Sequence, residues 1–413
     1  MSVKTCAPPN VVNCWENINF NIARNHVKKL QIRIAKAQQD GDVGKVVSLQ
    51  HRLIHSFYSK ALSVKIVTSN KGRYTPGVDN VLWITPEEKW KAIFELNRRG
   101  YKPKPLKRVY IKKPDGRKRP LSIPTMKDRA QQTLYKFTLE PIAEVTADSH
   151  SYGFRAGRST RDAIITCYRA LAREPYPEWI LEADIKACFD NILHQWIMEH
   201  VPMDKEILWK FLKSGYLENG RPYPTRRGIP QGGSISTVIC NMVLDGLEDQ
   251  LHTVVKDGTN IQFIRYVDDF IVIGTDKDEL EQTIIPVIER FLTERGLRLS
   301  PEKTVITHIN NGFDFLGWNV RRVEGQLSVT PSEKNLRAIS EKIGNTIKLN
   351  SHKAHWQQYT ILKPIIRGWL NYHIDVITRS SLYQAKSEIL AGLYQLTKDK
   401  HLMSLVESLF PIR

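Results

Sequence analysis

The stretch that decides the fold is Ile261-Gln-Phe-Ile-Arg-Tyr-Val-Asp268-Asp269-Phe-Ile-Val-Ile273. Apolar residues dominate on both sides of the two acids, so the pattern predicts two strands joined across a turn at Asp268-Asp269. Adjacent carboxylates repel each other, and such a pair is costly unless a cation offsets the charge. A simpler interpretation is a type I′ turn that uses Asp twice, because Asp favours such turns.

A third acid favours a metal site over an ordinary turn. The segment Trp179–Ala183 has the composition of a strand, and Asp184 follows directly at its end. Beside an Asp-Asp hairpin, it would complete the hard oxygen ligands that two Mg²⁺ ions about 3.5–4 Å apart require. One ion would activate a 3′-hydroxyl and the other would stabilise the leaving pyrophosphate. A helix N-cap is the simpler interpretation of Asp184, and Asp190 is more typical of a helix start than of a ligand.

The charge balance indicates a polyanionic partner. The chain has 61 Lys and Arg residues against 43 Asp and Glu residues, a formal net charge of +18. Nucleic acid is the first interpretation, and an anionic membrane surface is the second. The most basic stretch is 98–119, where Arg108–Ile111 and Arg119–Ile123 read as strands around the turn Pro114-Asp115-Gly116. We therefore expect a basic β-hairpin there.

Other patterns exclude several classes of protein. No run of about 18 apolar residues is present, so no membrane-spanning helix is expected, and the polar segment Met1–Phe20 is not typical of a signal peptide. The five cysteines are scattered without Cys-x-x-Cys spacing, which argues against a disulfide framework or a structural zinc site and predicts a cytoplasmic protein. The composition also excludes collagens, mucins, small secreted scaffolds and membrane channels.

Helical patterns dominate both ends of the chain. Near the N-terminus, apolar residues at helical spacing alternate with basic ones, and a second helical pattern runs from Val46 to Leu62. The first pattern consists of Val27, Leu30 and Ile34, with Lys28, Lys29, Arg33 and Lys36 between them. After about residue 330 we expect only helices, carrying Leu336–Ile347, then Trp356–Leu362, then a stretch that begins near Ser380.

Several motifs together resemble reverse transcriptases, and among them those encoded by bacterial group II introns and their group II-like relatives. The resemblance covers about residues 15 to 375. It rests on Tyr266-Val-Asp-Asp269, Asp184–Phe189, Pro230-Gln-Gly-Gly233, Ser151-Tyr-Gly-Phe-Arg155, Tyr74–Asp79 and Lys113–Arg129. In addition, Phe313–Trp318 resembles the primer grip of this family, and Pro364–Tyr372 resembles its thumb, called domain X.

The resemblance implies an α+β fold, namely a right-hand polymerase with fingers, a palm with an antiparallel sheet, and a helical thumb. We expect a helical N-terminal extension in residues 1–85, fingers and palm in 86–329, and the thumb in 330–413. The implied activity is RNA-directed DNA polymerisation, in which two Mg²⁺ ions serve the addition of dNTPs to a primer 3′-hydroxyl. The implied partners are an RNA template, a DNA or RNA primer, and dNTPs.

The resemblance also implies roles for residues around the metals. Asp184, Asp268 and Asp269 would be catalytic metal ligands, and Ile185 would contribute to metal and substrate binding. Lys303 matches a lysine thought to protonate pyrophosphate, although a solvated surface lysine is the simpler interpretation.

Further roles concern the incoming nucleotide. Phe189 would stack under the deoxyribose and exclude a 2′-hydroxyl, while a core phenylalanine is the simpler interpretation. Gln231 lies in a glycine loop, where backbone can approach a nucleotide closely. Lys113 and Arg119, on the basic hairpin, would grip the triphosphate, whereas a charge run is more often a solvated face.

Two other functions stay open. One is a non-catalytic maturase that binds structured intron RNA, against which the three acids argue. The other is a host-fixed reverse transcriptase that copies a dedicated non-coding RNA in phage defence or DNA repair. No cysteine lies beyond Cys240, so a zinc-containing endonuclease is not expected, and Gln384–Arg413 does not match the usual ending of domain X. The RNA partner and self-association are left open.

Overall fold

The computed structural model describes residues 12–112, 116, 118–174, 176–255, 261–397 and 400–410. The chain divides into two compact units. The first contains the described residues through Ser149 together with Ile185–Gln250 and Ile288–Leu299. The second contains His150–Asp184, Leu251–Val287 and the chain from Ser300 onward. Each unit is therefore assembled from segments that are far apart in the sequence.

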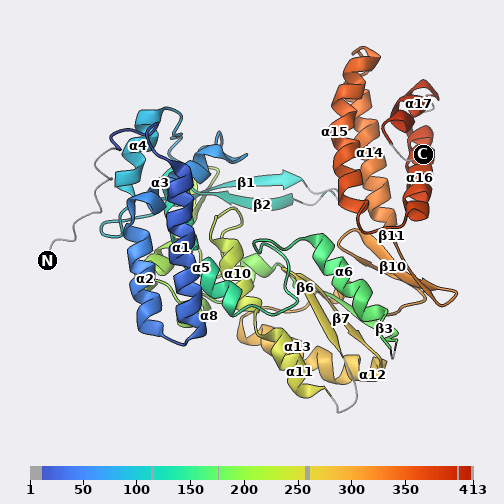
Figure 1. Ribbon diagram of the computed structural model, residues 1–413, viewed down its shortest axis with the longest axis horizontal. Coiled ribbons are helices and arrows are strands. Elements are labelled where there is room, and N and C mark those ends of the chain that lie inside the picture. The colour runs from blue at the N-terminus through green and yellow to red at the C-terminus, as the bar shows by residue number, and fades with distance from the viewer. Residues whose placement is uncertain are drawn as a thin grey trace. The chain divides into compact units, whose positions relative to one another are not determined.

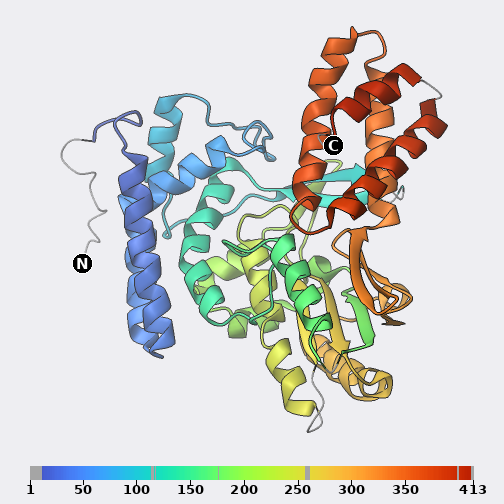
Figure 2. The ribbon, with the colours of Figure 1, turned by 45° about the vertical axis from the view of Figure 1, so that its right-hand side comes forward.

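Helices form the N-terminal part of the first unit. Helix α1 packs against α2, α3 and α5, and Figures 1 and 2 show these helices side by side. Their contact is apolar because Val27, Leu30 and Ile34 of α1 are buried, as the helical pattern predicts. The helices are α1 (Phe20–Gln39), α2 (Val43–His55), α3 (Phe57–Ser69), α4 (Pro86–Glu95) and α5 (Met126–Val145).

The expectation of one continuous helical pattern from Val46 to Leu62 is wrong. Ser56 has ψ of 130°, so α2 ends before it and α3 begins after it. The Ser56 hydroxyl lies 3.0 Å from the His26 imidazole, and such side-chain hydrogen bonds offer serine an alternative to helix.

The predicted basic hairpin is confirmed in the first unit. Strands β1 (Leu106–Lys112) and β2 (Lys118–Ile123) pair antiparallel. They belong to a four-stranded sheet of order β2-β1-β4-β5, in which β1 and β4 are parallel. The remaining elements are α7 (Cys188–Asn191), α8 (His194–His200), α9 (Lys205–Leu212), β4 (Tyr216–Glu218), β5 (Arg221–Tyr223) and α10 (Ser236–Leu244).

The second unit contains an antiparallel four-stranded sheet with the strand order β6-β7-β3-β8. Helix α6 (Thr160–Leu171) contributes apolar side chains to the core at this sheet. The strands are β3 (Trp179–Asp184), β6 (Gln262–Tyr266), β7 (Asp269–Gly274) and β8 (Val305–His308). Nearby in the chain are α11 (Leu247–Val254), α12 (Lys277–Glu279), a π-helical turn (Leu280–Ile284), α13 (Ile285–Glu294) and a 3₁₀ turn (Pro301–Lys303).

A second, three-stranded sheet leads into the helical end of the same unit. It has the order β11-β10-β9 and comprises β9 (Phe313–Phe315), β10 (Trp318–Val323) and β11 (Gln326–Pro331). The three helical patterns expected after residue 330 are confirmed, and a further short helix follows them. The helices are α14 (Glu333–Leu349), α15 (His355–His373), α16 (Arg379–Thr397) and α17 (Lys400–Ser408).

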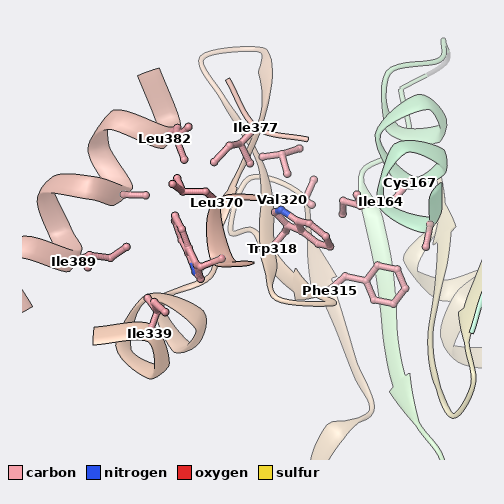
Figure 3. Packing of buried hydrophobic residues seen from close by; sticks show 14 of the residues in the cluster. Ile164, Cys167, Phe315, Trp318, Val320, Ile339, Leu370, Ile377, Leu382 and Ile389 are labelled. Atoms are coloured by element: carbon pink, nitrogen blue, oxygen red, sulfur yellow. The ribbon is translucent and has the colours of Figure 1, made fainter. Parts of the chain in front are cut away.

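One hydrophobic core joins both sheets of the second unit to its helices. Figure 3 shows Trp318 of β10 between Ile164 of α6 and Leu370 of α15, with Phe315 beside them. Trp318 is fully buried, and its ring stacks on Tyr372 at a centroid distance of 4.5 Å. The helices after residue 330 are thus held to the sheets by burial of large apolar surfaces. Among the described residues, no helix is long and apolar enough to span a membrane.

Candidate active site

The predicted hairpin is confirmed, but its turn lies at Val267 and Asp268, one residue earlier than expected, and the turn has a strained backbone. Tyr266 in β6 pairs with Asp269 in β7, which leaves Val267 and Asp268 between them. We call residues Tyr266–Asp269 the acidic turn. Val267 has φ of +64°, which is costly for a β-branched residue, whereas Asp268 is not among the described residues with positive φ. A type I′ turn requires positive φ at both central positions, so the simpler interpretation as an ordinary type I′ turn is wrong.

A loop from the segment before β3 lies against the acidic turn. We call residues Ser151–Gly157 the 151–157 loop. Ser151 forms a bridge with Arg265, and the Tyr152 backbone N–H donates to the Arg265 carbonyl at 2.9 Å. At Gly153, an added Cβ would lie 2.4 Å from Cγ2 of Val267 and 2.9 Å from its backbone nitrogen. Only glycine fits here, so the loop constrains the strained residue of the turn.

The third acid meets the hairpin because its strand pairs with β7. Asp184 is the last residue of β3 and lies directly opposite Asp269 in the antiparallel register. Its Oδ2 atom is 2.5 Å from Nζ of Lys303, which belongs to the 3₁₀ turn before β8. The Ser300 backbone N–H donates to the Asp184 carbonyl at 2.8 Å and fixes this turn. Asp184, Asp268, Asp269 and Lys303 therefore gather in the second unit.

The electrostatics of this cluster favour cations. Burial, together with the charges of Asp184 and Asp268, raises the pKa of Asp269 to about 7, against the opposing effect of Lys303. All three acids offer carboxylate oxygens, the donor type that Mg²⁺ prefers, so the donor set fits this metal. As the side chains of the described residues are arranged, no three His, Cys, Asp or Glu groups are positioned to hold an ion. Asp184 is neutralised by Lys303 instead.

Arg119 and Gln231, both expected near the nucleotide, form a connected group with Asp190 in the first unit. Nε of Arg119 donates to Oε1 of Gln231 at 3.0 Å. The amide of Gln231 in turn lies 3.3 and 3.4 Å from the two carboxylate oxygens of Asp190. Asp190 occupies the first turn of α7, as expected, but it also orients Gln231, which the sequence interpretation missed.

Two backbone hydrogen bonds join the glycine loop before Gln231 to the segment that contains Phe189. The N–H of Gly228 donates to the Ile192 carbonyl at 2.8 Å, and that of Ile229 donates to the Phe189 carbonyl at 2.7 Å. Gly228 has φ of +79°, and an added Cβ would lie 2.6 Å from the Asp190 carbonyl. The glycine loop therefore packs directly on the Phe189 segment. A cavity of about 420 Å³ is lined by both segments and by β1, with Phe189, Asp190, Gln231 and Arg108 among its residues.

Comparison with known proteins identifies the family. The family model described as reverse transcriptase (RNA-dependent DNA polymerase) matches residues 111–320, about half of the chain. The chain belongs to the reverse transcriptase family. A second model, the N-terminal domain of reverse transcriptase, matches residues 15–96 of this reverse transcriptase. The expected family resemblance and the expected α+β right-hand polymerase class, with its helical N-terminal region, are confirmed.

The chain is also similar to individual proteins. Protein YkfC of Escherichia coli is 31% identical over 325 residues, which cover 66% of this chain and 84% of YkfC. The group II intron-encoded protein LtrA of Lactococcus lactis is 31% identical over 321 residues, which cover 61% of this chain and 53% of LtrA. The chain thus spans about half the length of LtrA. A solved telomerase from Candida albicans, in complex with a fragment of telomeric RNA, is 14% identical with a TM-score of 0.44, and the match covers 76% of this chain and 62% of that one.

The other residues expected at the active site of this reverse transcriptase differ in their exposure. Lys113 lies outside the described residues, and Arg119 is exposed on β2. Ile185 is 1% exposed and bridges to Leu299, so its buried side chain is not available to a metal or a nucleotide. Ile185 could act only through its backbone, and that role stays a prediction.

Sequence reasoning missed an aromatic stack beside the basic hairpin. The Arg108 guanidinium lies 3.9 Å from the ring centroid of Tyr216, and Tyr216 stacks on Tyr223 at 5.3 Å. Such cation–π and aromatic contacts stabilise a surface and offer flat faces to a ligand. They arise because β4 pairs with β1 across a long sequence separation, which no local pattern reveals.

Proposed function

We propose that this chain is an RNA-directed DNA polymerase that adds dNTPs to the 3′-hydroxyl of a DNA or RNA primer on an RNA template. The observation that carries this proposal is the register of β3 and β7, which sets Asp184 opposite Asp269, and Asp269 follows Asp268 in the chain. Membership of the reverse transcriptase family supports the same activity.

The three acids would hold two Mg²⁺ ions, which when bound would activate the 3′-hydroxyl and stabilise the pyrophosphate. Metal binding competes with the ion pair between Lys303 and Asp184, because one Asp184 oxygen contacts Nζ. We propose that Lys303 leaves Asp184 when metal binds and then donates its proton to the leaving pyrophosphate. The ion pair thus holds the lysine close to the three acids until it is required.

The group around Gln231 would bind the nucleotide in this proposal. Arg119, with Lys113, would contact the triphosphate, since a guanidinium matches phosphate oxygens geometrically. Asp190 holds Gln231, which holds Arg119 in turn, so the hairpin and the glycine loop are oriented together. Phe189 would exclude the 2′-hydroxyl, and the Ile185 carbonyl would complete the metal and substrate contacts.

The test is primer extension by Asp268→Asn and Asp184→Asn. Each change removes a metal-binding charge, and extension should fall about 10³-fold or more while folding and RNA binding persist. Asp278→Asn changes an exposed acid of α12 and serves as the matched control with unchanged extension. Near-normal extension by Asp268→Asn with Mg²⁺ would refute the mechanism.

A maturase role is the second candidate, and it is compatible with polymerase activity in the same chain. The net charge of +18 and the similarity to LtrA, a group II intron-encoded protein, favour it. A host-fixed enzyme that copies a non-coding RNA in phage defence or DNA repair is the remaining alternative. The DNA that flanks the gene separates these roles, because a maturase gene lies within intron RNA structure and a host-fixed gene stands free beside a non-coding RNA.

Two further predictions, on the domain bounds and on the location, belong to this proposal. We keep residues 1–85 as the N-terminal extension, 86–329 as fingers and palm, and 330–413 as the thumb. A cytoplasmic location stays a prediction based on cysteine usage, and Cys14, Cys167, Cys188 and Cys240 are free thiols in the described chain. Self-association is left open.

A further inference from the structure

Phe154 combines a left-handed backbone with an exposed aromatic side chain. Its φ is +57°, a left-handed value that is uncommon for a bulky residue, and its side chain is 58% exposed. An ordinary loop position with this backbone would hold Gly or Asn, which adopt it readily. Strained backbone positions cluster at active sites and ligand clamps.

The 151–157 loop is held rigidly around Phe154. On one side, the Tyr152 N–H donates to Arg265, and the Tyr152 hydroxyl lies 2.7 Å from that of Thr166 in α6. On the other side, Nε of Arg155 donates to the Ser151 hydroxyl at 3.0 Å, and Arg158 donates to the Ser151 carbonyl at 2.7 Å. The two arms of the loop are thereby tied together, and the Phe154 ring projects from a fixed support.

The position of this ring relative to the acidic turn is equally constrained. Gly153 contacts Val267 directly, and Phe154 is the next residue, with its Cα about 3.8 Å farther along the chain. All of these residues belong to the second unit, so the placement does not depend on the other unit. The backbone of Phe154 therefore lies next to the acidic turn.

We infer that Phe154 is a binding residue for the template–primer duplex where its 3′ end meets the acidic turn. This inference rests on the proposed polymerase function. An RNA-containing duplex presents a wide, shallow minor groove with sugar edges and base edges, against which a flat aromatic side chain can pack. The ring provides apolar contact that does not depend on base identity, as a general polymerase requires.

The experiment measures the Kd for a fluorescent RNA–DNA template–primer without dNTP, together with kinetic constants. Phe154→Ala and Phe154→Asn should weaken duplex binding roughly 5-fold or more, which is the lower end of the range for loss of an aromatic contact to a base. The KM for dNTP at saturating duplex should not change. Phe154→Tyr, which keeps the ring, should bind like the wild type.

Stability separates this role from a structural one. Asn tolerates the left-handed backbone, so Phe154→Asn should have a Tm equal to or above that of the wild type while it binds duplex more weakly. A structural phenylalanine would instead lower the Tm and leave the Kd unchanged. Glu324→Asn is the matched control, because Glu324 has φ of +49° in the turn between β10 and β11, and its Kd should stay at the wild-type value.

The results distinguish a failure of the inference about Phe154 from a failure of the proposed polymerase function. Unchanged Kd in Phe154→Ala and Phe154→Asn would overturn the inference, and so would an effect confined to the KM for dNTP. Wild-type protein that binds duplex but does not extend a primer would refute the proposed function instead. The Kd comparison would still decide whether Phe154 binds the duplex.

Discussion

Asp184, Asp268 and Asp269 place three carboxylates in one small part of the second unit, and Lys303 offsets only part of their charge. Buried like charges destabilise a folded chain, and a bound cation removes that cost. Function and stability are therefore opposed at these residues. A substitution that abolishes metal binding should make the metal-free protein more stable.

The pKa of Asp269 determines whether stability rises or falls with pH, and over which pH range it changes. Its value of about 7 exceeds the ordinary value near 4, so the folded protein binds this proton more tightly than the unfolded chain does. Without divalent metal, stability should fall as the pH rises from about 4 to about 7 and stay reduced above that. Asp269→Asn should remove this component and raise the Tm at pH 8 by a few degrees.

Thermal unfolding in EDTA at pH 5 and pH 8 measures the difference between the two proteins. Added Mg²⁺ should raise the Tm of the wild type at pH 8 and have little effect on Asp269→Asn. A variant that follows the wild type at both pH values would show that Asp269 is not the group responsible.

At the scale of elements, the contact between the 151–157 loop and the acidic turn sets the catalytic geometry. In Gly153→Ala, the new Cβ would overlap Val267, including its backbone nitrogen, so the turn must move. A displacement of about 1 Å at a reacting group can cost roughly 10²-fold in rate. We expect kcat to fall about 10- to 100-fold with the fold intact.

Primer extension at saturating dNTP and duplex, with circular dichroism as a check on folding, measures this effect. Gly44→Ala in α2 is the matched control, because its new Cβ would have only an ordinary contact of 3.7 Å with Asp42. A folded Gly153→Ala protein with wild-type kcat would mean that the turn keeps its geometry without the glycine.

The elements also show what the sequence reveals and what it hides. The Asp-Asp hairpin, the basic hairpin and the thumb helices follow from local patterns of apolar residues and turn formers, and all three are present. The link from Arg119 through Gln231 to Asp190 joins three distant segments, so no local pattern contains it. Apolar residues keep their helical spacing through Ser56 although the helical backbone is interrupted there. The sequence pattern therefore does not reveal the helix break.

At the scale of the whole molecule, the positive charge exceeds what a nucleotide site requires. Lys28, Lys29, Arg33 and Lys36 are all exposed on α1, because Val27, Leu30 and Ile34 are buried. We predict that this face binds RNA beyond the template. Replacing the four basic residues with Gln should weaken the binding of structured RNA and reduce the salt dependence, by roughly 0.7–0.9 in log–log slope per lost phosphate contact.

Titration of RNA binding against salt concentration measures both quantities. Extension on a saturating template–primer should be preserved, which separates this face from the catalytic residues. Unchanged affinity and unchanged slope would identify the face as one that contacts only solvent.

The pairing of β3 with β7 also has a consequence for biosynthesis. The chain leaves the second unit directly after Asp184, contributes Ile185–Gln250 to the first unit, and returns before Asp269 is made. At about 5–20 residues per second, a ribosome leaves β3 without its partner strand for several seconds. During that interval a newly made β3, with Ile180 and Leu181 bound for the core, exposes an unpaired apolar edge. We therefore expect the nascent chain to be prone to aggregation during this interval, which is the condition that chaperones relieve.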